Sequence, residues 1–442
     1  MFQRVLIANR GVIARRIVRA LNSLGIESVV VYSEADQGAP YLAEATQAIA
    51  LKGVSAAESY LNVDVLEGVI RKTGADAVHP GYGFLAENAG FARRVAACGA
   101  RFIGPAPDLI EQMGDKVCAR QLAVEHNFPC HAGSALIASQ DEALTEAARI
   151  GYPVMVKPAA GGGGIGMQVA DSDASLRQAF SRAGVMAERA FGSAAVYLER
   201  WIENPRHIEV QVLGDGKDAM HLYERECSVQ RRHQKVIEES PAPGIDRAEL
   251  EPVLNRARQF SADIGYDSVG TIETLRGADG AYGFLEMNTR IQVEHGVTEM
   301  VTGVDLVSAQ IALAAGLGLP KTKPLVGHAL EVRVYAEDSR TLMPSTGQLS
   351  CFRPPQLHGV RVETGMAQGQ FVTQHYDPML AKLISVGHTR EMAIGRALVA
   401  CRAFEIRGVN TNLALLQKIL TDPVFIAGNI DTGYLDRLLA KT

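Results

Sequence analysis

The chain has 442 residues, 47% of them hydrophobic, and a formal net charge of −5 at pH 7. That length exceeds what one ordinary core accommodates, so we expect two or three domains. The basic residues are spread along the chain and no apolar run reaches about 18 residues, so neither nucleic acid nor a membrane is expected as a partner.

The N-terminal part of the chain predicts a parallel sheet. Its expected elements are strands at residues 4–9, 27–33 and 75–79 and helices at residues 11–24 and 62–73. Strands that alternate with helices favour a parallel α/β sheet. The last of these strands runs into the glycine-rich segment HPGYGFLAEN (79–88), at a strand end where such sheets bind ligands. This first domain is expected to close near residue 110.

Four consecutive glycines, residues 161–164, follow a predicted strand that ends in Lys157. Glycine lets a backbone approach a phosphate closely and turn its N–H groups toward it, so a lysine before such a loop predicts a phosphate contact. A flexible hairpin tip is the alternative. Earlier in the chain, MGDK (113–116) precedes a helix, and Lys116 taken alone is typical of a surface lysine.

The next segment predicts two strands, a charged loop and a helix. Residues 196–213 are expected to form a strand, a bend at Asn204–Pro205 and a second strand, and a helix is expected over 248–263. Between them, QRRHQK (230–235) concentrates basic groups. Such a cluster is typical either of a solvated charge run or of a loop that faces a substrate.

A hairpin is expected next, with strands at 270–276 and 281–286 around the turn GADG. In that register Glu273 faces the same side as Glu286. Two carboxylates held this close repel each other unless a cation lies between them. With Asn288 they form an all-oxygen set, which suits Mg²⁺ or Mn²⁺ bound together with the phosphates of a nucleotide.

Polar side chains continue at every second position beyond the hairpin: Glu286, Asn288, Arg290, Gln292 and Glu294. In an extended chain they would share one face, where carboxylates, an amide and a guanidinium predict metal ligands beside an anion-binding site. The alternative is the polar face of a surface strand. Farther on, short strands (346–387) and a helix (390–405) predict a third, smaller α+β domain.

Eight motifs in a fixed order extend over nearly the whole chain: IANRG, HPGYGFLAEN, MGDK, AGGGGIGM, ENPRHIEVQVL, QRRHQKV, EMNTRIQVEH and YDPMLAKL. On these motifs the chain resembles the biotin carboxylases of the ATP-grasp superfamily. The resemblance implies a mixed α/β and α+β fold in three parts. They are a Rossmann-like parallel-sheet domain at 1–112, an ATP-grasp domain at 113–318 with a glycine-rich lid at about 132–203, and a C-terminal α+β domain at 319–442.

In that family the γ-phosphoryl group of MgATP passes to bicarbonate, and the resulting carboxyphosphate serves to carboxylate biotin. The resemblance implies nucleotide contacts at Lys116, Lys157, Gly163, Gly164, His207, Gln230 and His233 and, around the adenine, at Glu199, Arg200, Trp201 and Ile202. The implied ligands of two Mg²⁺ or Mn²⁺ ions are Glu273, Glu286 and Asn288. The implied bicarbonate pocket consists of Lys235, Arg290, Gln292 and Val293. Nearest the chemistry, Glu294 matches the general base, Arg333 the residue that stabilises the biotin enolate, and Tyr82 a loop residue beside biotin.

Several positions depart from the pattern of that family. They are Val12 in place of glutamate, Ala160 and Ile165 in the glycine-rich segment, Gly296 where proline is usual, and Val334–Tyr335 after the matched arginine. None of them removes a matched catalytic side chain, so we expect effects on rate and on lid motion rather than on the reaction itself.

The resemblance also implies partners and a setting. Members of the family are commonly homodimers, and Arg16 and Arg19 are present on the first predicted helix. Biotin is attached to the lysine of a Met-Lys-Met-like hairpin, and no methionine here precedes a lysine. We therefore expect biotin on a separate biotin carboxyl carrier protein and separate carboxyltransferase subunits, as in an acetyl-CoA or other acyl-CoA carboxylase. Six scattered cysteines without a C-x-x-C pair, and an N-terminus without a signal peptide, favour the cytoplasm.

Two other interpretations stay open. The same ATP-grasp chemistry could serve a urea, pyruvate or other acyl carboxylase, or the chain could be a non-catalytic nucleotide-binding subunit. The complete set of charged site residues argues against a non-catalytic subunit, because loss of function usually removes such residues first. ATP hydrolysis, measured with and without bicarbonate and biotin, separates these interpretations.

Overall fold

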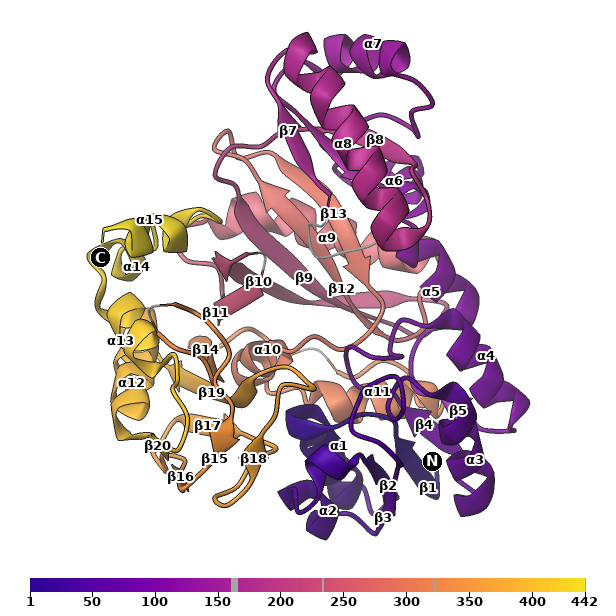
Figure 1. Cartoon of the computed structure of the whole chain (residues 1–442), viewed down its shortest axis with the longest axis vertical. Helices are drawn as coiled ribbons and strands as arrows, with labels where there is room; N and C mark the ends of the chain where they lie inside the picture. The colour runs from indigo at the N-terminus through magenta and orange to yellow at the C-terminus, as the bar shows by residue number, and fades with distance from the viewer. Residues whose placement is uncertain (160–165, 233, 322, 340, 442) are drawn as a thin grey trace.

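The structure is a computed structural model that describes residues 1–159, 166–232, 234–321, 323–339 and 341–441. Its N-terminal part forms a five-stranded sheet in the order β3-β2-β1-β4-β5, at the bottom of Figure 1. The strands are β1 (Arg4–Ile7), β2 (Glu27–Tyr32), β3 (Gln47–Ala50), β4 (Ala77–His79) and β5 (Arg101–Phe102). All neighbours in this sheet pair in parallel, so the predicted parallel sheet is confirmed.

Helices flank this sheet and pack apolar faces against it. They are α1 (Gly11–Ser23), the 3-10 turn η1 (Glu34–Asp36), α2 (Pro40–Glu44), α3 (Val63–Thr73), α4 (Ala89–Ala97) and α5 (Pro107–Gly114). Helix α3 shows why such elements begin and end where they do. The Asn62 side chain accepts a hydrogen bond from the Val65 amide, and Gly74 closes the helix with a φ of +64°, a left-handed conformation that glycine adopts without strain.

An antiparallel sheet of eight strands crosses the middle of the molecule (Figure 1), in the order β13-β12-β9-β10-β11-β14-β19-β17. Its strands are β9 (Arg206–Gly214), β10 (Ala219–Arg231), β11 (Gln234–Ser240), β12 (Val269–Arg276), β13 (Tyr282–Asn288), β14 (His328–Tyr335), β17 (Val360–Glu363) and β19 (Met379–Gly387). Helices α9 (Arg247–Asp263), α10 (His295–Thr302) and α11 (Leu306–Ala314) pack against it. Because β11 pairs with β14, the predicted second and third domains share this one sheet.

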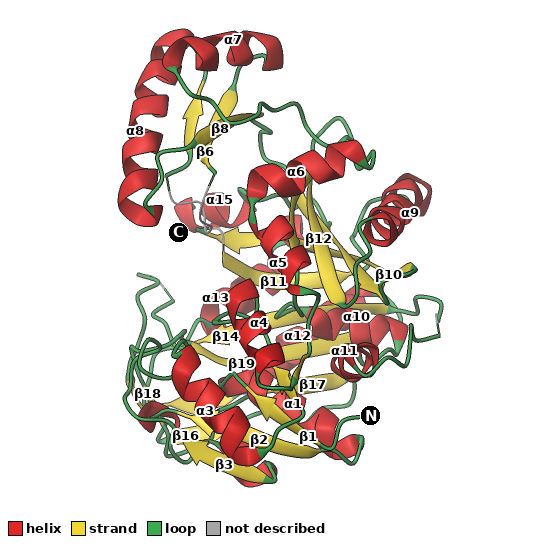
Figure 2. Ribbon diagram, turned by 90° about the vertical axis from the view of Figure 1, so that its right-hand side faces the viewer, coloured by secondary structure: helices red, strands yellow, loops and turns green. Residues whose placement is uncertain are grey.

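A smaller unit stands at the top of both views (Figures 1 and 2). It contains a three-stranded sheet in the order β7-β6-β8 and two covering helices. Its elements are α7 (Gln140–Ile150), β6 (Val154–Pro158), β7 (Gln168–Ala170), α8 (Asp173–Phe191) and β8 (Val196–Arg200), and α6 (Lys116–Glu125) precedes them. This unit has a buried apolar cluster of its own. It falls within the predicted lid, whose four consecutive glycines lie outside the described residues.

The C-terminal part completes the fold with short strands and four helices. The strands β15 (Gly347–Gln348), β16 (Cys351–Arg353), β18 (Phe371–Val372) and β20 (Glu405–Arg407) form two small sheets, and the helices are α12 (Arg390–Ala403), α13 (Leu413–Thr421), α14 (Pro423–Ile426) and α15 (Tyr434–Ala440). The predicted short strands and helix of this region are confirmed. Among the described residues no single helix is long and apolar enough to cross a membrane; α10 and α11 pass that test only as a pair, bent by 97°.

The charged segment QRRHQK differs from the predicted loop. Gln230 lies in β10 and Lys235 in β11, where the two residues are paired across the strands. Gln230 and Arg231 therefore belong to β10, and Gln234 and Lys235 to β11, because the strand pairing extends into the charged residues. Lys235 is thereby held on a strand, pointing into the protein interior.

The predicted extended row of polar residues is also wrong beyond Asn288. Strand β13 ends there, and the chain turns into α10, which begins at His295. Val297 and Val301 of this helix bury against Ile384 and other apolar residues. That burial draws the segment out of the sheet, so its polar side chains do not share a strand face.

Alanine at two glycines should have opposite effects on stability. Gly214 ends β9, and an added Cβ there would overlap the backbone carbonyl oxygen of Tyr266. We expect the free energy of unfolding of Gly214→Ala to fall by about 1–3 kcal/mol, the usual cost of overpacking. Gly395 lies inside α12, where an added Cβ meets no atom within 4 Å, so Gly395→Ala should gain about 0.5–1 kcal/mol. Denaturant unfolding of both variants measures these changes, and a Gly214→Ala protein as stable as wild type would contradict the close approach.

Candidate active site

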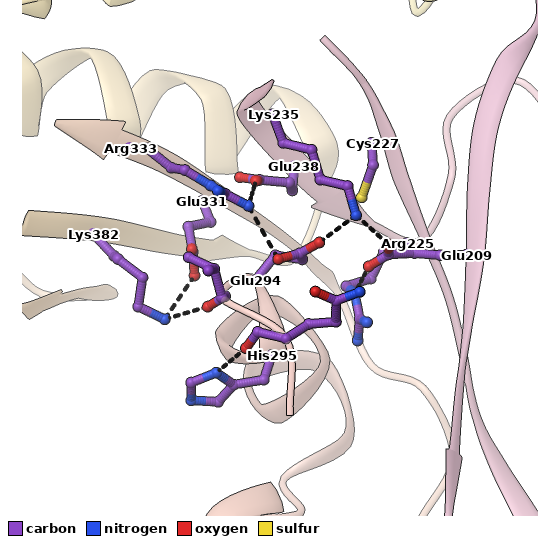
Figure 3. A network of polar contacts seen from close by, with 12 residues as sticks. Glu209, Arg225, Cys227, Lys235, Glu238, Glu294, His295, Glu331, Arg333 and Lys382 are labelled. Atoms are coloured by element: carbon purple, nitrogen blue, oxygen red, sulfur yellow. Dashed lines mark hydrogen bonds and ion pairs between the residues drawn. The ribbon is translucent and has the colours of Figure 1, made fainter. Parts of the chain in front are cut away.

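Glu294 occupies the centre of the site, where the chain enters α10. Its side chain is 1% exposed, and its carboxylate accepts hydrogen bonds from Lys235 Nζ at 2.6 Å and Arg333 Nη2 at 3.0 Å (Figure 3). Burial alone would raise the pKa of Glu294, but Lys235, Arg333 and the nearby Arg225 hold that pKa well below its usual range. The carboxylate is therefore ionised, which a group that accepts a proton must be.

Lys235 joins carboxylates from three separate elements. Its ammonium lies 2.6 Å from Glu209 Oε2, 3.0 Å from Glu273 Oε1 and 2.6 Å from Glu294 Oε1. A lysine ammonium has three N–H donors, and these contacts use all of them. Burial alone would lower the pKa of Lys235, but the three carboxylates raise it well above its usual value. Lys235 is therefore a fixed positive charge in the site.

Glu209 and Arg225 form a buried ion pair that no motif predicted. The Arg225 guanidinium also donates hydrogen bonds to Gln211 Oε1 at 2.7 Å and Thr298 Oγ1 at 2.8 Å. It thus ties β9 and β10 to α10, the helix that begins just after Glu294. The alternation of His207, Glu209 and Gln211 along an otherwise apolar strand is the sequence signal that could have revealed this network.

The hairpin of β12 and β13 presents the predicted metal ligands on one face. Glu273 and Glu286 lie directly opposite each other. The predicted shared face is therefore confirmed, but the two residues form a direct pair rather than the predicted diagonal one, and the register shifts between Glu273 and Thr274. Glu273 Oε1 accepts a hydrogen bond from Asn288 Nδ2 at 2.9 Å, and Glu273 Oε2 lies 2.8 Å from His207 Nε2. Although burial alone would raise it, the pKa of Glu273 is held well below its usual range by Lys235 and His207.

This donor set fits a hard divalent cation. Two carboxylates and an amide supply only oxygen ligands on one face, as Mg²⁺ and Mn²⁺ prefer. The Glu286 side chain is 37% exposed, so its carboxylate is open to an ion that takes further ligands from phosphate and water. Glu273, by contrast, already faces an ammonium, an amide and an imidazole.

Arg290 gathers side chains around the turn that follows β13. Its Nε lies 2.9 Å from Glu87 Oε2, and its two terminal nitrogens donate to Gln292 Oε1 at 2.9 Å and Asn288 Oδ1 at 2.7 Å. Glu87 also accepts a hydrogen bond from the Thr289 amide at 3.1 Å. Glu87 comes from the glycine-rich HPGYGFLAEN segment, so the N-terminal domain fixes this arginine. No role was predicted for Glu87, although its motif was recognised.

The nucleotide side of the site carries two lysines that pair with carboxylates. Lys157 on β6 contacts Glu199 on β8, and Arg120 Nη1 lies 3.5 Å from Glu199 Oε1. These cations hold the pKa of Glu199 below its ordinary value, although burial alone would raise it. Lys116 Nζ lies 3.6 Å from Glu286 Oε2, which brings the start of α6 to the β12–β13 hairpin.

The other residues predicted to contact the nucleotide lie on several separate elements. Gln230 Nε2 lies 2.7 Å from His207 Nδ1, so these two do meet. Arg200 Nη1 donates to the Ile150 carbonyl at 3.2 Å, at the end of α7. Trp201 and Ile202 follow β8 and are partly buried. Three further predicted residues, Gly163, Gly164 and His233, lie outside the described part of the chain.

Tyr82 lies at a cavity of about 270 Å³ between the N-terminal domain and the C-terminal part. Arg10, Phe84, Met366 and Asp377 also line this cavity. The Tyr82 hydroxyl is buried, and burial raises its pKa well above the usual value. The structure thus places the predicted biotin-side residue beside an open volume rather than in the polar network around the base.

Glu331 lies on β14, two residues before Arg333. It should make the free energy of unfolding depend on pH. Burial raises the pKa of Glu331 to about 8, even though Lys382 Nζ lies 3.4 Å away. The folded protein therefore binds a proton that the unfolded chain releases near pH 4.3. Since the native state binds more protons in this window, the free energy of unfolding should fall as pH rises from about 4 to 8.

Glu331→Gln removes this titration. Urea unfolding at pH 6 and pH 8.5 should therefore show a smaller loss of stability in Glu331→Gln than in wild type. Equal losses in the two proteins would contradict the raised pKa.

Comparison with known proteins gives a consistent result over the whole chain. Residues 1–110 match the family of biotin carboxylase N-terminal domains, 115–322 the ATP-binding domain of the carbamoyl-phosphate synthase L chain, and 331–437 the biotin carboxylase C-terminal domain. A biotin carboxylase from Halalkalibacterium halodurans is 46% identical over 448 residues, covering 100% of this chain and 99% of the relative.

Two solved structures are similar along their full length. The crystal structure of a biotin carboxylase–β,γ-ATP complex from Campylobacter jejuni has a TM-score of 0.96 at 41% identity and covers 99% of each chain. The biotin carboxylase domain dimer of the Hydrogenobacter thermophilus 2-oxoglutarate carboxylase, solved with MgADP, ADP and bicarbonate, has a TM-score of 0.94 at 41% identity. It covers 99% of this chain and 98% of that chain.

Proposed function

The chain belongs to the biotin carboxylase family, and from that premise we propose that it carboxylates biotin on a carrier protein, using ATP and bicarbonate. Carboxyphosphate is the intermediate. The observation that carries this proposal is the ionised Glu294 carboxylate held between Lys235 and Arg333. A buried base between two cations is suited to deprotonating an anion that the same cations bind.

The first step is phosphoryl transfer from ATP to bicarbonate. Lys116 and Lys157 would neutralise the phosphates of ATP, and residues 199–202 would contact the adenine. Glu273, Glu286 and Asn288 would hold the divalent ions, which when bound spread the negative charge of the transferred group. Phosphate oxygens would then replace the carboxylates that the two lysines contact in this structure.

Bicarbonate would bind next to the base. Arg290, Gln292 and the Val293 backbone would hold it together with Lys235, and Glu294 would take its proton. The negative charges of bicarbonate and ATP offset the cations around Glu294. Its pKa should therefore rise on substrate binding, from the low value of the free protein toward one suited to a base.

Arg333 would act in the second step, when biotin loses its ureido proton and negative charge develops on the ureido oxygen. Its guanidinium lies 2.5 Å from Glu238 Oε1 and 3.0 Å from Glu294 Oε2. Among the described residues, no hydrogen-bond acceptor is found for Arg333 Nε. The arginine is thus fixed in position with a donor free for the developing oxyanion, while Tyr82 would lie nearer the rest of biotin.

Glu294→Gln tests this proposal. Glutamine keeps the shape of the side chain but cannot accept a proton at neutral pH, so bicarbonate-dependent ATP hydrolysis with biotin should fall by about 100-fold or more. The affinity for MgATP should change little.

Glu226→Gln is the matched control, because Glu226 is a buried carboxyl group paired with Arg206 outside the site. It should keep wild-type turnover. Full turnover in Glu294→Gln would refute the assignment of the base, and no bicarbonate-dependent hydrolysis in wild type would refute the function.

The proposed setting is a cytoplasmic complex with a carrier protein and carboxyltransferase subunits of an acyl-CoA carboxylase. The final acceptor need not be an acyl-CoA, since the Hydrogenobacter relative is the biotin carboxylase domain of a 2-oxoglutarate carboxylase. That relative is a dimer. We extend the homodimer to this chain, with α1 at the interface. Arg19 on α1 is half exposed, whereas Arg16 is tied to Glu299 at 2.9 Å and Asp305 at 2.7 Å.

Carboxylation should be much faster with carrier-bound biotin than with free biotin. Docking of a carrier raises the effective concentration of biotin at the site, by about 10²–10⁴ in apparent affinity for linked binding events. Carboxylation rates with free biotin and with a biotinylated carrier protein, at equal biotin concentration, measure the difference. Equal rates would argue against a carrier as the partner.

A further inference from the structure

Lys382 is a fully buried lysine behind the catalytic base, and none of the motif-based roles includes it. Its side chain is 0% exposed. Its Nζ donates to the Val293 carbonyl oxygen at 2.5 Å and lies 3.0 Å from Glu363 Oε2 and 3.4 Å from Glu331 Oε2. Taking an ammonium out of water costs several kcal/mol, so a lysine in this position needs partners for all three of its donors.

The strand pairing explains how Lys382 reaches that carbonyl. Lys382 on β19 is directly opposite Arg333 on β14, and Ile384 is opposite Glu331. Opposed residues of antiparallel strands share a face, so these four side chains form one block that faces the start of α10. Arg333 contacts the side chain of Glu294, and Lys382 contacts the backbone just before it (Figure 3).

His295 holds the preceding peptide group. Its Nδ1 lies 2.8 Å from the Gln292 carbonyl oxygen, and because a carbonyl only accepts, Nδ1 carries the proton. Burial and the nearby Lys382 keep the pKa of His295 well below its usual value. Carbonyls of two successive peptide groups, those of Gln292 and Val293, are therefore each held by a buried donor.

The orientation of these carbonyls determines where the amides point. In a planar trans peptide the C=O and the following N–H point in opposite directions. The Gln292 carbonyl thus sets the direction of the Val293 N–H, and the Val293 carbonyl sets that of the Glu294 N–H. Together they determine the path of the backbone that carries the base.

Gly296 follows His295 and makes the two buried donors, Lys382 and His295, necessary for holding this backbone segment. Gly296 has no side chain of its own to hold the segment, and glycine has more backbone freedom than any other residue. An added Cβ at Gly296 would come within 2.8 Å of Arg361 Nη2 and 3.0 Å of Glu331 Oε2. The segment therefore lies close against the β14–β19 face, where Lys382 is anchored.

We propose that Lys382 is a positioning residue for Glu294, the base that would act on bicarbonate. Through the Val293 carbonyl it fixes the peptide group between Val293 and Glu294, and so the direction of the Glu294 N–H and the position of the base. This inference rests on the proposed function of the same site. Lys382 touches no substrate in this scheme and acts only through the backbone.

Lys382→Met tests the inference by removing the donor while keeping a long apolar side chain. Because a small misplacement of a reacting group can cost about 100-fold, we expect the KM for bicarbonate to rise by about tenfold or more and kcat to fall. The KM for MgATP should stay within about twofold of wild type. A merely structural role would not separate the two substrates.

A double variant tests the same inference in case Lys382→Met does not fold. Lys382→Met/Glu363→Gln removes one positive and one negative charge together, so no additional carboxylate is left unpaired in the interior. It should show the same selective rise in the KM for bicarbonate.

Ser385→Ala is the matched control. Ser385 is buried on the same strand and donates to the Ala393 carbonyl at 2.8 Å, on the other face from Lys382. Its loss should lower stability without changing either KM. An unchanged KM for bicarbonate in the Lys382 variants, or an equal rise in the KM for MgATP, would overturn the inference, whereas inactive wild-type protein would instead refute the proposed function.

Discussion

A single buried ammonium, that of Lys235, sets the geometry of this site. Its three donors face three carboxylates, those of Glu209, Glu273 and Glu294. Moving such charges out of water costs several kcal/mol each, and only close pairing offsets that cost. The carboxylates stand on β9, on β12 and at the start of α10, so these elements must meet within hydrogen-bonding distance of one lysine. The central sheet and the helix packed on it satisfy that requirement.

One lysine neutralises only one of the three carboxylates. Two arginines supply the positive charge that the other two need. Arg225 on β10 pairs with Glu209 on β9, and Arg333 on β14 pairs with Glu294. The pKa of Glu294 is held low for this reason. A carboxylate that is strongly stabilised as an anion is a weak base. In the proposed mechanism, bound substrate anions would offset the surrounding cations and raise the basicity of Glu294.

The site depends on all parts of the chain. Glu87 from the N-terminal domain fixes Arg290, while Arg333 and Lys382 reach the base from strands near the C-terminus. Lys157, on the smaller sheet, contacts Glu199 on the neighbouring strand of that sheet. The strands β14, β17 and β19 complete the same eight-stranded sheet that carries the β12–β13 hairpin. This shared sheet lets residues from distant parts of the sequence act at one point.

The sequence by itself determined the features that depend on local order. Alternating strands and helices predicted the parallel sheet, and strand period with turn residues predicted that Glu273 and Glu286 lie on the same side of their hairpin. The ordered motifs predicted the family. These are short-range properties, because side-chain alternation and turn chemistry act within a few residues.

Only the tertiary structure decided which groups meet across the chain. The contact of Arg290 with Glu87 spans 203 positions, and that of Lys382 with Val293 spans 89. The extended row was wrong because apolar burial of α10 overrides the local alternation that follows Asn288. The alternation along β9 marks Glu209 as unusual, but the partners of Glu209, Arg225 and Lys382 could not be predicted from it. A buried charge is tolerated only where its partners are, and those partners come from strands that are adjacent in space but distant in sequence.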